Sequence, residues 1–374
     1  MNSPVNLRAE NVLGLKRTLS VMLTYQCNAE CANCGTLSHP RAKGTLDREV
    51  LMSAIAAAGT LDFGNVVFTG GEATLRPVLL LEGLQAGRAH GLSTRLVTNA
   101  YWARTPERAT TAVARLVDAG LQEINFSTGE EHIRFVELDR VGRAAAAALR
   151  AGLTTCIMVE LRTGRQFDAD DVRSLPDLRE AEAETGRRAM VIESPWMPLD
   201  PFEPGMNADT RVTDQANVAA RNGCDSVLQT YTLMPDGNIK ACCGIGARLI
   251  PELTVGDLAE DDFLPSSIAA AERDFLKYWL RFEGPEKILA WCAEHDPTID
   301  WEGLYAHRCQ ACLRIYKDER VQRVICEHYH EILSNVMLGA WMDTVAIPNS
   351  LNQGSQLPQQ NVPIGMPNAR EDQI

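Results

Sequence analysis

Short runs of apolar residues alternate with helix-like stretches between residues 18 and 195. The apolar runs predict six strands, and the amphipathic stretches between them predict five helices. This alternation is typical of βαβ units that form a parallel sheet, in which strands buried on both faces are continuously apolar. Six units are too few for an eight-stranded barrel, so we expect an α/β fold with a partial (β/α)6 barrel of parallel strands. The strands are predicted at 18–25, 65–69, 94–98, 123–127, 154–161 and 189–193, and the helices at 47–58, 76–90, 105–119, 137–151 and 169–184.

The remainder of the chain has a different character. Residues 195–215 are rich in proline and turn-forming residues, which indicates a domain boundary. Residues 346–374 are rich in Pro, Asn, Gln and Gly, a composition that is typical of a flexible tail. We therefore expect an N-terminal segment (1–17), a barrel (18–200), a cysteine-rich domain (201–345) with helices at 267–281 and 317–338, and the tail (346–374).

Composition narrows the functional class. Of 374 residues, 45% are hydrophobic and 23% are charged, as in a globular protein. No apolar run is long enough to cross a bilayer, and the first ten residues lack the apolar core of an export signal. The net charge of −13 disfavours nucleic acid as a partner. We expect a cytoplasmic protein that binds neither membrane nor nucleic acid.

Eleven cysteines in a chain without an export signal indicate metal or redox chemistry. Three of them, Cys27, Cys31 and Cys34, follow the first predicted strand directly. Three thiolates on one loop can bind three irons of a [4Fe–4S] cube and leave the fourth iron open. A zinc site normally has four protein ligands at paired spacings, which this triplet does not supply.

A second motif, Gly70-Gly71-Glu72, follows the second predicted strand. The carboxyl ends of parallel strands meet at one edge, so this motif should lie beside the cysteine triplet. Glycines allow a ligand to approach the backbone closely, and a carboxylate can accept hydrogen bonds from an ammonium group. A CxxxCxxC motif after the first strand and Gly-Gly-Glu after the second resemble the radical S-adenosylmethionine superfamily.

The resemblance implies a chemistry and a set of contacts. The open iron would chelate S-adenosylmethionine, and an electron from flavodoxin or ferredoxin would cleave it to methionine and a 5′-deoxyadenosyl radical that removes a substrate hydrogen. Gly70, Gly71 and Glu72 would contact the methionine amino group. Small polar side chains at later strand ends would contact the ribose, carboxylate or substrate, although capping of the strand ends or solvation explains them equally well. They are Thr98, Asn99, Ser127, Thr128 and Glu160.

The second group of cysteines lies in the C-terminal half. Cys224 and Cys242 flank a Pro-Asp-Gly turn that predicts a β-hairpin, and Cys309 and Cys312 form a CxxC motif. Four thiolates can bind zinc or a [4Fe–4S] cluster. The pattern resembles the SPASM and twitch extensions of the superfamily, which implies one auxiliary [4Fe–4S] cluster on these four. Two alternatives remain open: Cys243 could replace Cys242, or Cys243 could join Cys292 and Cys326 in a second cluster. Cys156 is expected to be inert core.

The substrate is not encoded in these motifs. The resemblance favours oxidative modification or cross-linking of a ribosomally made peptide. Dehydrogenation or rearrangement of a small metabolite of the aminocyclitol or sugar type is the alternative. An iron–sulfur or zinc protein without radical chemistry is a third possibility from another class.

Overall fold

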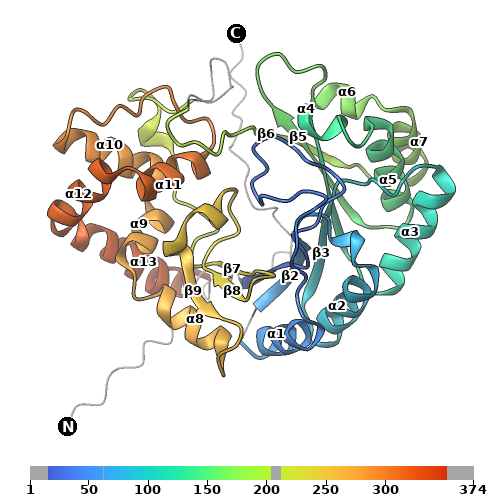
Figure 1. The fold of residues 1–374 in the computed structure, drawn as a ribbon, viewed down its shortest axis with the longest axis horizontal. Helices are drawn as coiled ribbons and strands as arrows, with labels where there is room; N and C mark the ends of the chain where they lie inside the picture. Colours follow the sequence, from blue (N-terminus) through green and yellow to red (C-terminus); the bar gives the residue numbers. More distant parts are fainter. Residues whose placement is uncertain (1–15, 62, 204–211, 352–374) are drawn as a thin grey trace.

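Six parallel strands form the first part of a computed structural model that describes residues 16–61, 63–203 and 212–351. They follow the order β6-β5-β4-β3-β2-β1, so each unit adds a strand beside the previous one. The sheet curves with its helices on the outer side (Figure 1). This arrangement confirms the predicted α/β partial barrel. The strands are β1 (Arg17–Met22), β2 (Phe63–Thr69), β3 (Ser93–Thr98), β4 (Glu123–Thr128), β5 (Thr154–Leu161) and β6 (Met190–Pro195).

Three helices of the barrel, α1, α3 and α6, begin at side chains that cap the first turn. Asp47 accepts hydrogen bonds from the first turn of α1, and Thr105 does so for α3. The single helix expected over 169–184 is wrong: the structure has two helices, separated at Pro176, which lacks an amide hydrogen and therefore begins a new helix. The helices are α1 (Arg48–Thr60), α2 (Pro77–Ala89), α3 (Pro106–Asp118), α4 (Glu130–Ile133), α5 (Leu138–Arg150), α6 (Ala169–Arg173) and α7 (Pro176–Thr185).

The sheet does not end at the first strand. β7 (Thr230–Leu233) pairs in parallel with β1, and β8 (Asn238–Lys240) and β9 (Thr254–Asp257) continue antiparallel to give nine strands. The turn between β7 and β8 contains Gly237 with φ +92°, so the predicted Pro-Asp-Gly hairpin is confirmed. The cysteine-rich region, expected as a separate domain, therefore shares the sheet of the barrel.

Helices form the rest of this second region, around a separate apolar core that includes Trp279, Trp301 and Tyr305. The continuous helices expected over 267–281 and 317–338 are wrong. Asp274 caps a new helix within the first range, and the short 3-10 turn η5 (Tyr329–Glu331) interrupts the second. The helices are α8 (Phe263–Ala271), α9 (Phe275–Phe282), α10 (Pro285–His295), α11 (Arg308–Lys317), α12 (Glu319–His328) and α13 (Leu333–Leu351).

Two expected segments lie largely outside the described residues. Residues 1–15 of the N-terminal segment and 352–374 of the tail fall there, whereas α13 extends past residue 346, where the tail was expected to begin. In the described part of the chain, every helix is too short or too polar to cross a bilayer.

Candidate active site and cysteine clusters

The three N-terminal cysteines lie on a loop that folds back over the carboxyl ends of the parallel strands. Isolated bridges Thr24–Thr45 and Gln26–His39 fix the base of this loop. All three thiols are half-buried. Burial raises the pKa of Cys31 to about 12, and negative charge on the nearby thiols of Cys34 and Cys27 raises it further. A cationic metal cluster would reverse this balance and favour the thiolates, so the triplet fits such a group.

The Gly-Gly-Glu motif joins β2 to the base of this loop. The amide of Gly71 donates to the carbonyl of Thr24 at 2.8 Å, and that of Glu72 donates to Gln26 at 2.9 Å. A Cβ atom on Gly71 would lie only 2.2 Å from the Gln26 carbonyl oxygen. The glycine is therefore required for the close approach of the chain to itself, which the sequence did not predict.

The Glu72 carboxylate is buried and accepts hydrogen bonds from the chain itself. One oxygen accepts from the Thr98 hydroxyl at 2.8 Å, and the other accepts from the Asn99 amide at 2.9 Å. The pKa of Glu72 is raised, because the effect of burial outweighs the lowering by these bonds and by those from Thr74. Glu72 thus ties the end of β2 to the end of β3. Its contact with an ammonium group stays a prediction.

Thr98 and Asn99 differ in what they face. The Thr98 hydroxyl accepts from the indole nitrogen of Trp102 at 3.2 Å and is almost fully buried, which fits capping of the strand end. The Asn99 side chain reaches the cysteine loop: its amide nitrogen donates to Asn28 at 2.9 Å and lies 3.8 Å from the Cys27 sulfur. The structure therefore brings Asn99 to the cysteine triplet.

The ends of β4 and β5 complete the polar rim. Ser127 is half-buried, and the buried hydroxyl of Thr128 has no hydrogen-bond partner among the described residues. Glu160 accepts from the backbone amide of Glu131 at 3.2 Å, close to Gly129, where a Cβ atom would lie 2.1 Å from the Glu160 Cβ. Contacts of these side chains with ribose or substrate stay predictions.

Sequence reasoning missed Glu131, which connects the rim to the cysteine loop. Its carboxylate accepts from the Ala32 amide at 3.1 Å and from Arg162 at 3.2 Å, and its backbone carbonyl accepts from the Cys31 thiol at 3.6 Å. The only signal in the sequence was a polar Glu-Glu-His segment after the fourth strand. The contact depends on a fold that joins residues about 100 positions apart, so it could not be predicted locally.

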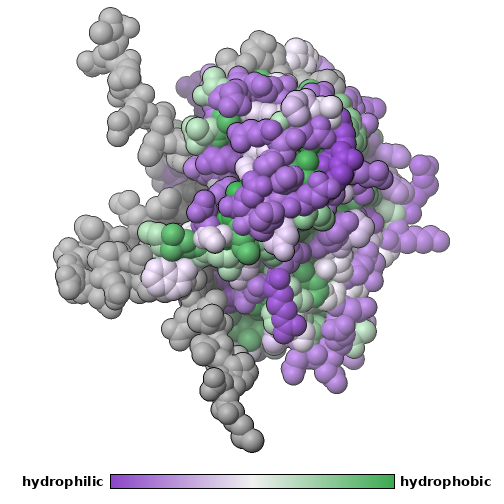
Figure 2. Space-filling model, turned by 90° about the vertical axis from the view of Figure 1, so that its left-hand side faces the viewer, coloured by the Kyte–Doolittle hydropathy of each residue, from purple (hydrophilic) through white to green (hydrophobic). Residues whose placement is uncertain are grey.

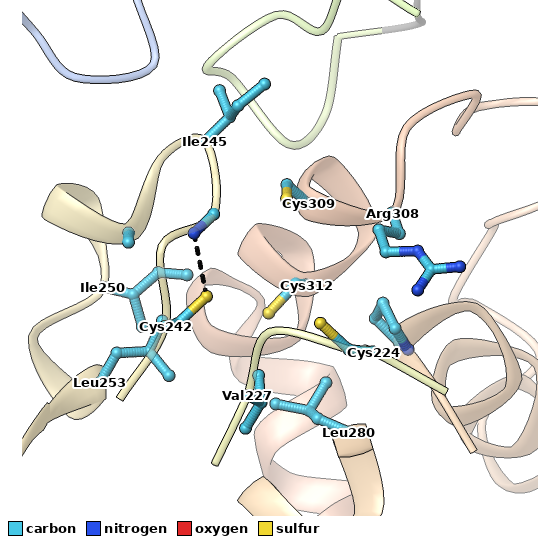
Figure 3. A pocket seen from close by; sticks show the side chains of 13 residues that line it. Cys224, Val227, Cys242, Ile245, Ile250, Leu253, Leu280, Arg308, Cys309 and Cys312 are labelled. Carbon is cyan, nitrogen blue, oxygen red and sulfur yellow. Dashed lines mark hydrogen bonds between the residues drawn. The ribbon is translucent and has the colours of Figure 1, made fainter. Parts of the chain in front are cut away.

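Four C-terminal cysteines line one cavity of the second region (Figure 3). They come from three parts of the chain: Cys224 precedes β7, Cys242 follows β8, and Cys309 and Cys312 lie in the first two turns of α11. The amide of Gly244 donates to the Cys242 sulfur at 3.1 Å. The set includes every cysteine assigned to the auxiliary cluster, namely Cys224, Cys242, Cys309 and Cys312.

The neighbouring cysteines are placed elsewhere. Cys243 does not line the cavity and instead donates toward the Ser226 hydroxyl at 3.5 Å. Cys292 is buried in the core on α10, Cys326 is exposed on α12, and Cys156 is buried on β5. Cys292 and Cys326 lie on different helices, and neither of them lines the cavity. Cys242, and not Cys243, lines the cavity together with the other three assigned cysteines.

The spacing of the sulfurs favours a cluster over a single zinc ion. Four thiolates around one zinc at about 2.3 Å lie roughly 3.8 Å from one another. Among the residues that the structure describes, no three cysteine sulfurs all lie within 4.8 Å of one another. An iron–sulfur cube, in which each thiolate binds a different corner, needs a wider separation of the sulfurs than a single ion does. The four cysteines around one cavity supply the four thiolates that such a cube needs.

The fold and the two cysteine constellations define a parallel α/β half-barrel with a cysteine-lined extension. No family model matches the chain, and no curated protein matches its sequence significantly. Solved structures do match it. One is anSMEcpe with bound S-adenosylmethionine and Cp18Cys peptide, at 13% identity and a TM-score of 0.49, covering 85% of this chain and 99% of that one.

Two further structures are similar over much of their length. BtrN in complex with S-adenosylmethionine and 2-DOIA matches at 14% identity and a TM-score of 0.41, covering 73% of this chain and 90% of its own. SuiB of Streptococcus suis bound to precursor peptide SuiA matches at 14% identity and a TM-score of 0.44, covering 83% and 77%. At these identities and TM-scores, no substrate or activity transfers from them to this chain.

Proposed function

We propose that the protein is a radical S-adenosylmethionine enzyme. One observation carries the proposal: the Cys27, Cys31 and Cys34 loop lies on the carboxyl ends of a parallel half-barrel, next to Gly-Gly-Glu. These three cysteines would hold a [4Fe–4S] cluster with an open iron. When S-adenosylmethionine is bound, this cluster supplies the electron that splits it into methionine and a 5′-deoxyadenosyl radical.

The residues of the rim would hold the strand ends and the cysteine loop in position and would exclude water from the site. Glu72 fixes the ends of β2 and β3, and Asn99 holds the cysteine loop against them. The buried hydroxyl of Thr128 has no hydrogen-bond partner among the described residues, which costs about 1–3 kcal/mol, and a hydrogen bond to a bound ligand would recover this free energy. Glu160 and Arg162, 3.5 Å apart, would present charged groups to the ribose or the substrate.

The second region would hold one auxiliary [4Fe–4S] cluster on Cys224, Cys242, Cys309 and Cys312. Such a site can accept an electron from the substrate radical that hydrogen removal leaves behind, so the proposed reaction is a net two-electron oxidation of the substrate, with flavodoxin or ferredoxin as the donor to the first cluster. For the substrate we propose a ribosomally made peptide, modified or cross-linked oxidatively. The alternative is a small aminocyclitol or sugar metabolite.

Reductive cleavage of S-adenosylmethionine tests the proposed chemistry. The anaerobically prepared protein should release 5′-deoxyadenosine when dithionite and S-adenosylmethionine are added, and Cys31→Ala should not. The matched control is Cys326→Ser, which alters an exposed cysteine outside both sites and should retain activity. An iron–sulfur or zinc protein without radical chemistry would give no 5′-deoxyadenosine in any variant.

Iron analysis tests the auxiliary site separately. The Cys27/Cys31/Cys34 triple alanine variant should retain about four irons per chain. Adding Cys312→Ala should remove them, whereas adding Cys243→Ala should not. Iron near zero in the triple variant would contradict the auxiliary cluster while leaving the first site intact as a proposal.

Isotope transfer separates the two substrate classes. If the substrate is a peptide, a deuterated precursor peptide should transfer deuterium to 5′-deoxyadenosine, because the radical removes a substrate hydrogen. Transfer from a deuterated aminocyclitol, and none from the peptide, would instead establish the small-molecule alternative.

A further inference from the structure

Two histidines and a glutamate meet in the second region, where α10 and α12 end. His295 is the last residue of α10, His328 is the last residue of α12, and Glu331 ends η5. One ligating atom from each lies within 4.8 Å of the others. In the part of the chain that the structure describes, this is the sole group of three His, Cys, Asp or Glu side chains that meets this criterion.

The carboxylate of Glu331 contacts both imidazoles. One oxygen is 2.8 Å from Nδ1 of His328, and the other is 3.5 Å from Nε2 of His295. The two rings stack with their centres 4.3 Å apart and their planes inclined by 26°. Two imidazole nitrogens and a carboxylate oxygen therefore lie within one small volume, and they form a donor set that divalent transition metals bind.

Rigid neighbours hold this arrangement. The Trp291 ring packs on His295 at 4.4 Å and on the fully buried Trp279 at 5.0 Å. Arg323 of α12 forms an ion pair with Asp296, the residue after His295, at 3.2 Å. The ligating groups thus sit on two helix ends that are fixed to each other, which lowers the entropic cost of binding a metal ion.

The local electrostatics favour a cation. Both histidines lie at helix carboxyl ends, where the partial negative charge of the helix stabilises positive charge. The side chains of His295, His328 and Glu331 are 22%, 36% and 42% exposed, so an ion has access from solvent. Figure 2, which views the molecule from the side that carries α10 and α12 in Figure 1, shows a predominantly hydrophilic surface.

We propose that His295, His328 and Glu331 bind a divalent transition-metal ion, with Zn²⁺ the best match to two imidazoles and one carboxylate. Water completes the coordination shell. The ion ties the end of α10 to the end of α12 and to the turn that leads into α13. This site is independent of the cysteine clusters and of the proposed radical chemistry, because it shares no residue with them.

Zinc binding to the full-length, cluster-containing protein tests the site. The experiment uses the Cys326→Ser background, which removes an exposed thiol on the same helix. After anaerobic equilibrium dialysis against ZnCl₂, elemental analysis should find one more zinc per chain than in His328→Ala or Glu331→Gln. Removal of a residue that only hydrogen-bonds to a metal ligand weakens metal binding about 10–100-fold. Removal of a ligand itself should weaken zinc binding at least as much. His330→Ala, an exposed histidine outside the group, is the matched control and should bind as the background does.

Two results would overturn the proposal. Equal amounts of zinc in the background and in both ligand variants would mean that the metal binds elsewhere, including on cysteines. Absence of zinc from all of these proteins would mean that His295, His328 and Glu331 only interact with one another and bind no metal. If His328→Ala fails to fold, Glu331→Gln and anomalous diffraction at the zinc edge still decide the matter. A zinc peak between the two imidazoles is the expected result, and its absence from zinc-soaked crystals contradicts the site.

Discussion

Glu72 illustrates how one buried carboxylate organises a strand end. Its side chain is 1% exposed and accepts from Thr98, Asn99 and Thr74. We expect Glu72→Ala to lower the free energy of unfolding by about 2–5 kcal/mol, because several buried donors lose their acceptor. Glu72→Gln, which keeps one acceptor oxygen, should cost less. Denaturant unfolding of the cluster-containing protein measures both.

The control is Glu82→Ala, which removes a partly exposed ion pair with Arg48 and should cost at most about 1 kcal/mol. Equal effects of Glu72→Ala and Glu82→Ala would contradict the role assigned to Glu72.

His132 gives a residue-scale prediction for pH. Burial lowers its pKa to about 4, and its Nδ1 has no hydrogen-bond partner among the described residues. The unfolded chain, with a histidine pKa near 6.5, therefore binds the proton first, so stability is lost as pH falls from about 6.5 toward 4. The full effect is at most about 3 kcal/mol.

His132→Leu removes this titration. The difference in unfolding free energy between variant and wild type should shift in favour of the variant when the pH is lowered from 7.5 to 5.5. His90→Leu, at an exposed position, should show no such shift. A pH-independent difference for His132→Leu would show that the imidazole is not held neutral by burial.

At the scale of elements, the end of β2 and the cysteine loop depend on one glycine. A Cβ atom at Gly71 would lie 2.2 Å from the backbone oxygen of Gln26, which cannot move without displacing the loop. Gly71→Ala should therefore reduce iron in the first site and destabilise the fold by several kcal/mol. Iron analysis and unfolding curves measure these effects. Gly339→Ala on α13, with open space around its Cβ position, should be neutral or slightly stabilising.

The elements that the sequence predicted are those with local signals. The six strands were predicted to within a few residues because continuous apolar runs alternate with amphipathic helices. Helix α11 was not predicted, although its cysteines were, since its first turn is capped by the imidazole of His307, which accepts from Cys309 at 3.1 Å. Histidine is not a usual capping signal in a sequence.

The same distinction between local signals and tertiary contacts applies to the candidate site. Cysteine spacing and Gly-Gly-Glu identified the two constellations, but the contact of Glu131 with the cysteine loop depends on tertiary packing. For the same reason, the choice between Cys242 and Cys243 needed the structure: adjacent residues point to different sides of a chain, and only Cys242 lines the cavity.

For the whole molecule, the pairing of β1 with β7 makes the barrel and the second region one sheet. Thr18–Val21 face Thr230–Leu233 across a parallel ladder that no local pattern predicts. A chain that ends at residue 200 would expose β1 as an open edge, a known cause of aggregation. We expect such a chain to be aggregated in size-exclusion chromatography, whereas the full chain is not. A monomeric, folded fragment would contradict the shared sheet as a requirement for folding.

Arg248 joins the two regions at the cysteine loop itself. Its guanidinium lies 3.7 Å from the centre of the Tyr25 ring and donates to the carbonyls of Thr36 at 2.7 Å and Leu37 at 3.3 Å, just after Cys34. Charge-assisted bonds of this kind contribute about 1.5–3 kcal/mol each, and a cation–π contact adds about 0.5–2 kcal/mol. Arg248→Ala should therefore loosen the end of the loop that carries the third cysteine.

The expected consequence is selective. Under a chelator, Arg248→Ala should release iron from the N-terminal site faster than wild type. Adding Arg248→Ala to the Cys27/Cys31/Cys34 triple alanine variant, which retains only the second site, should leave the rate of iron release unchanged. Arg248→Lys keeps the charge but loses the forked donor geometry, so its rate should be intermediate. Arg273→Ala, at an exposed position, controls for loss of charge. Equal acceleration at both sites would mean that Arg248 stabilises the second region as a whole and does not act on the cysteine loop.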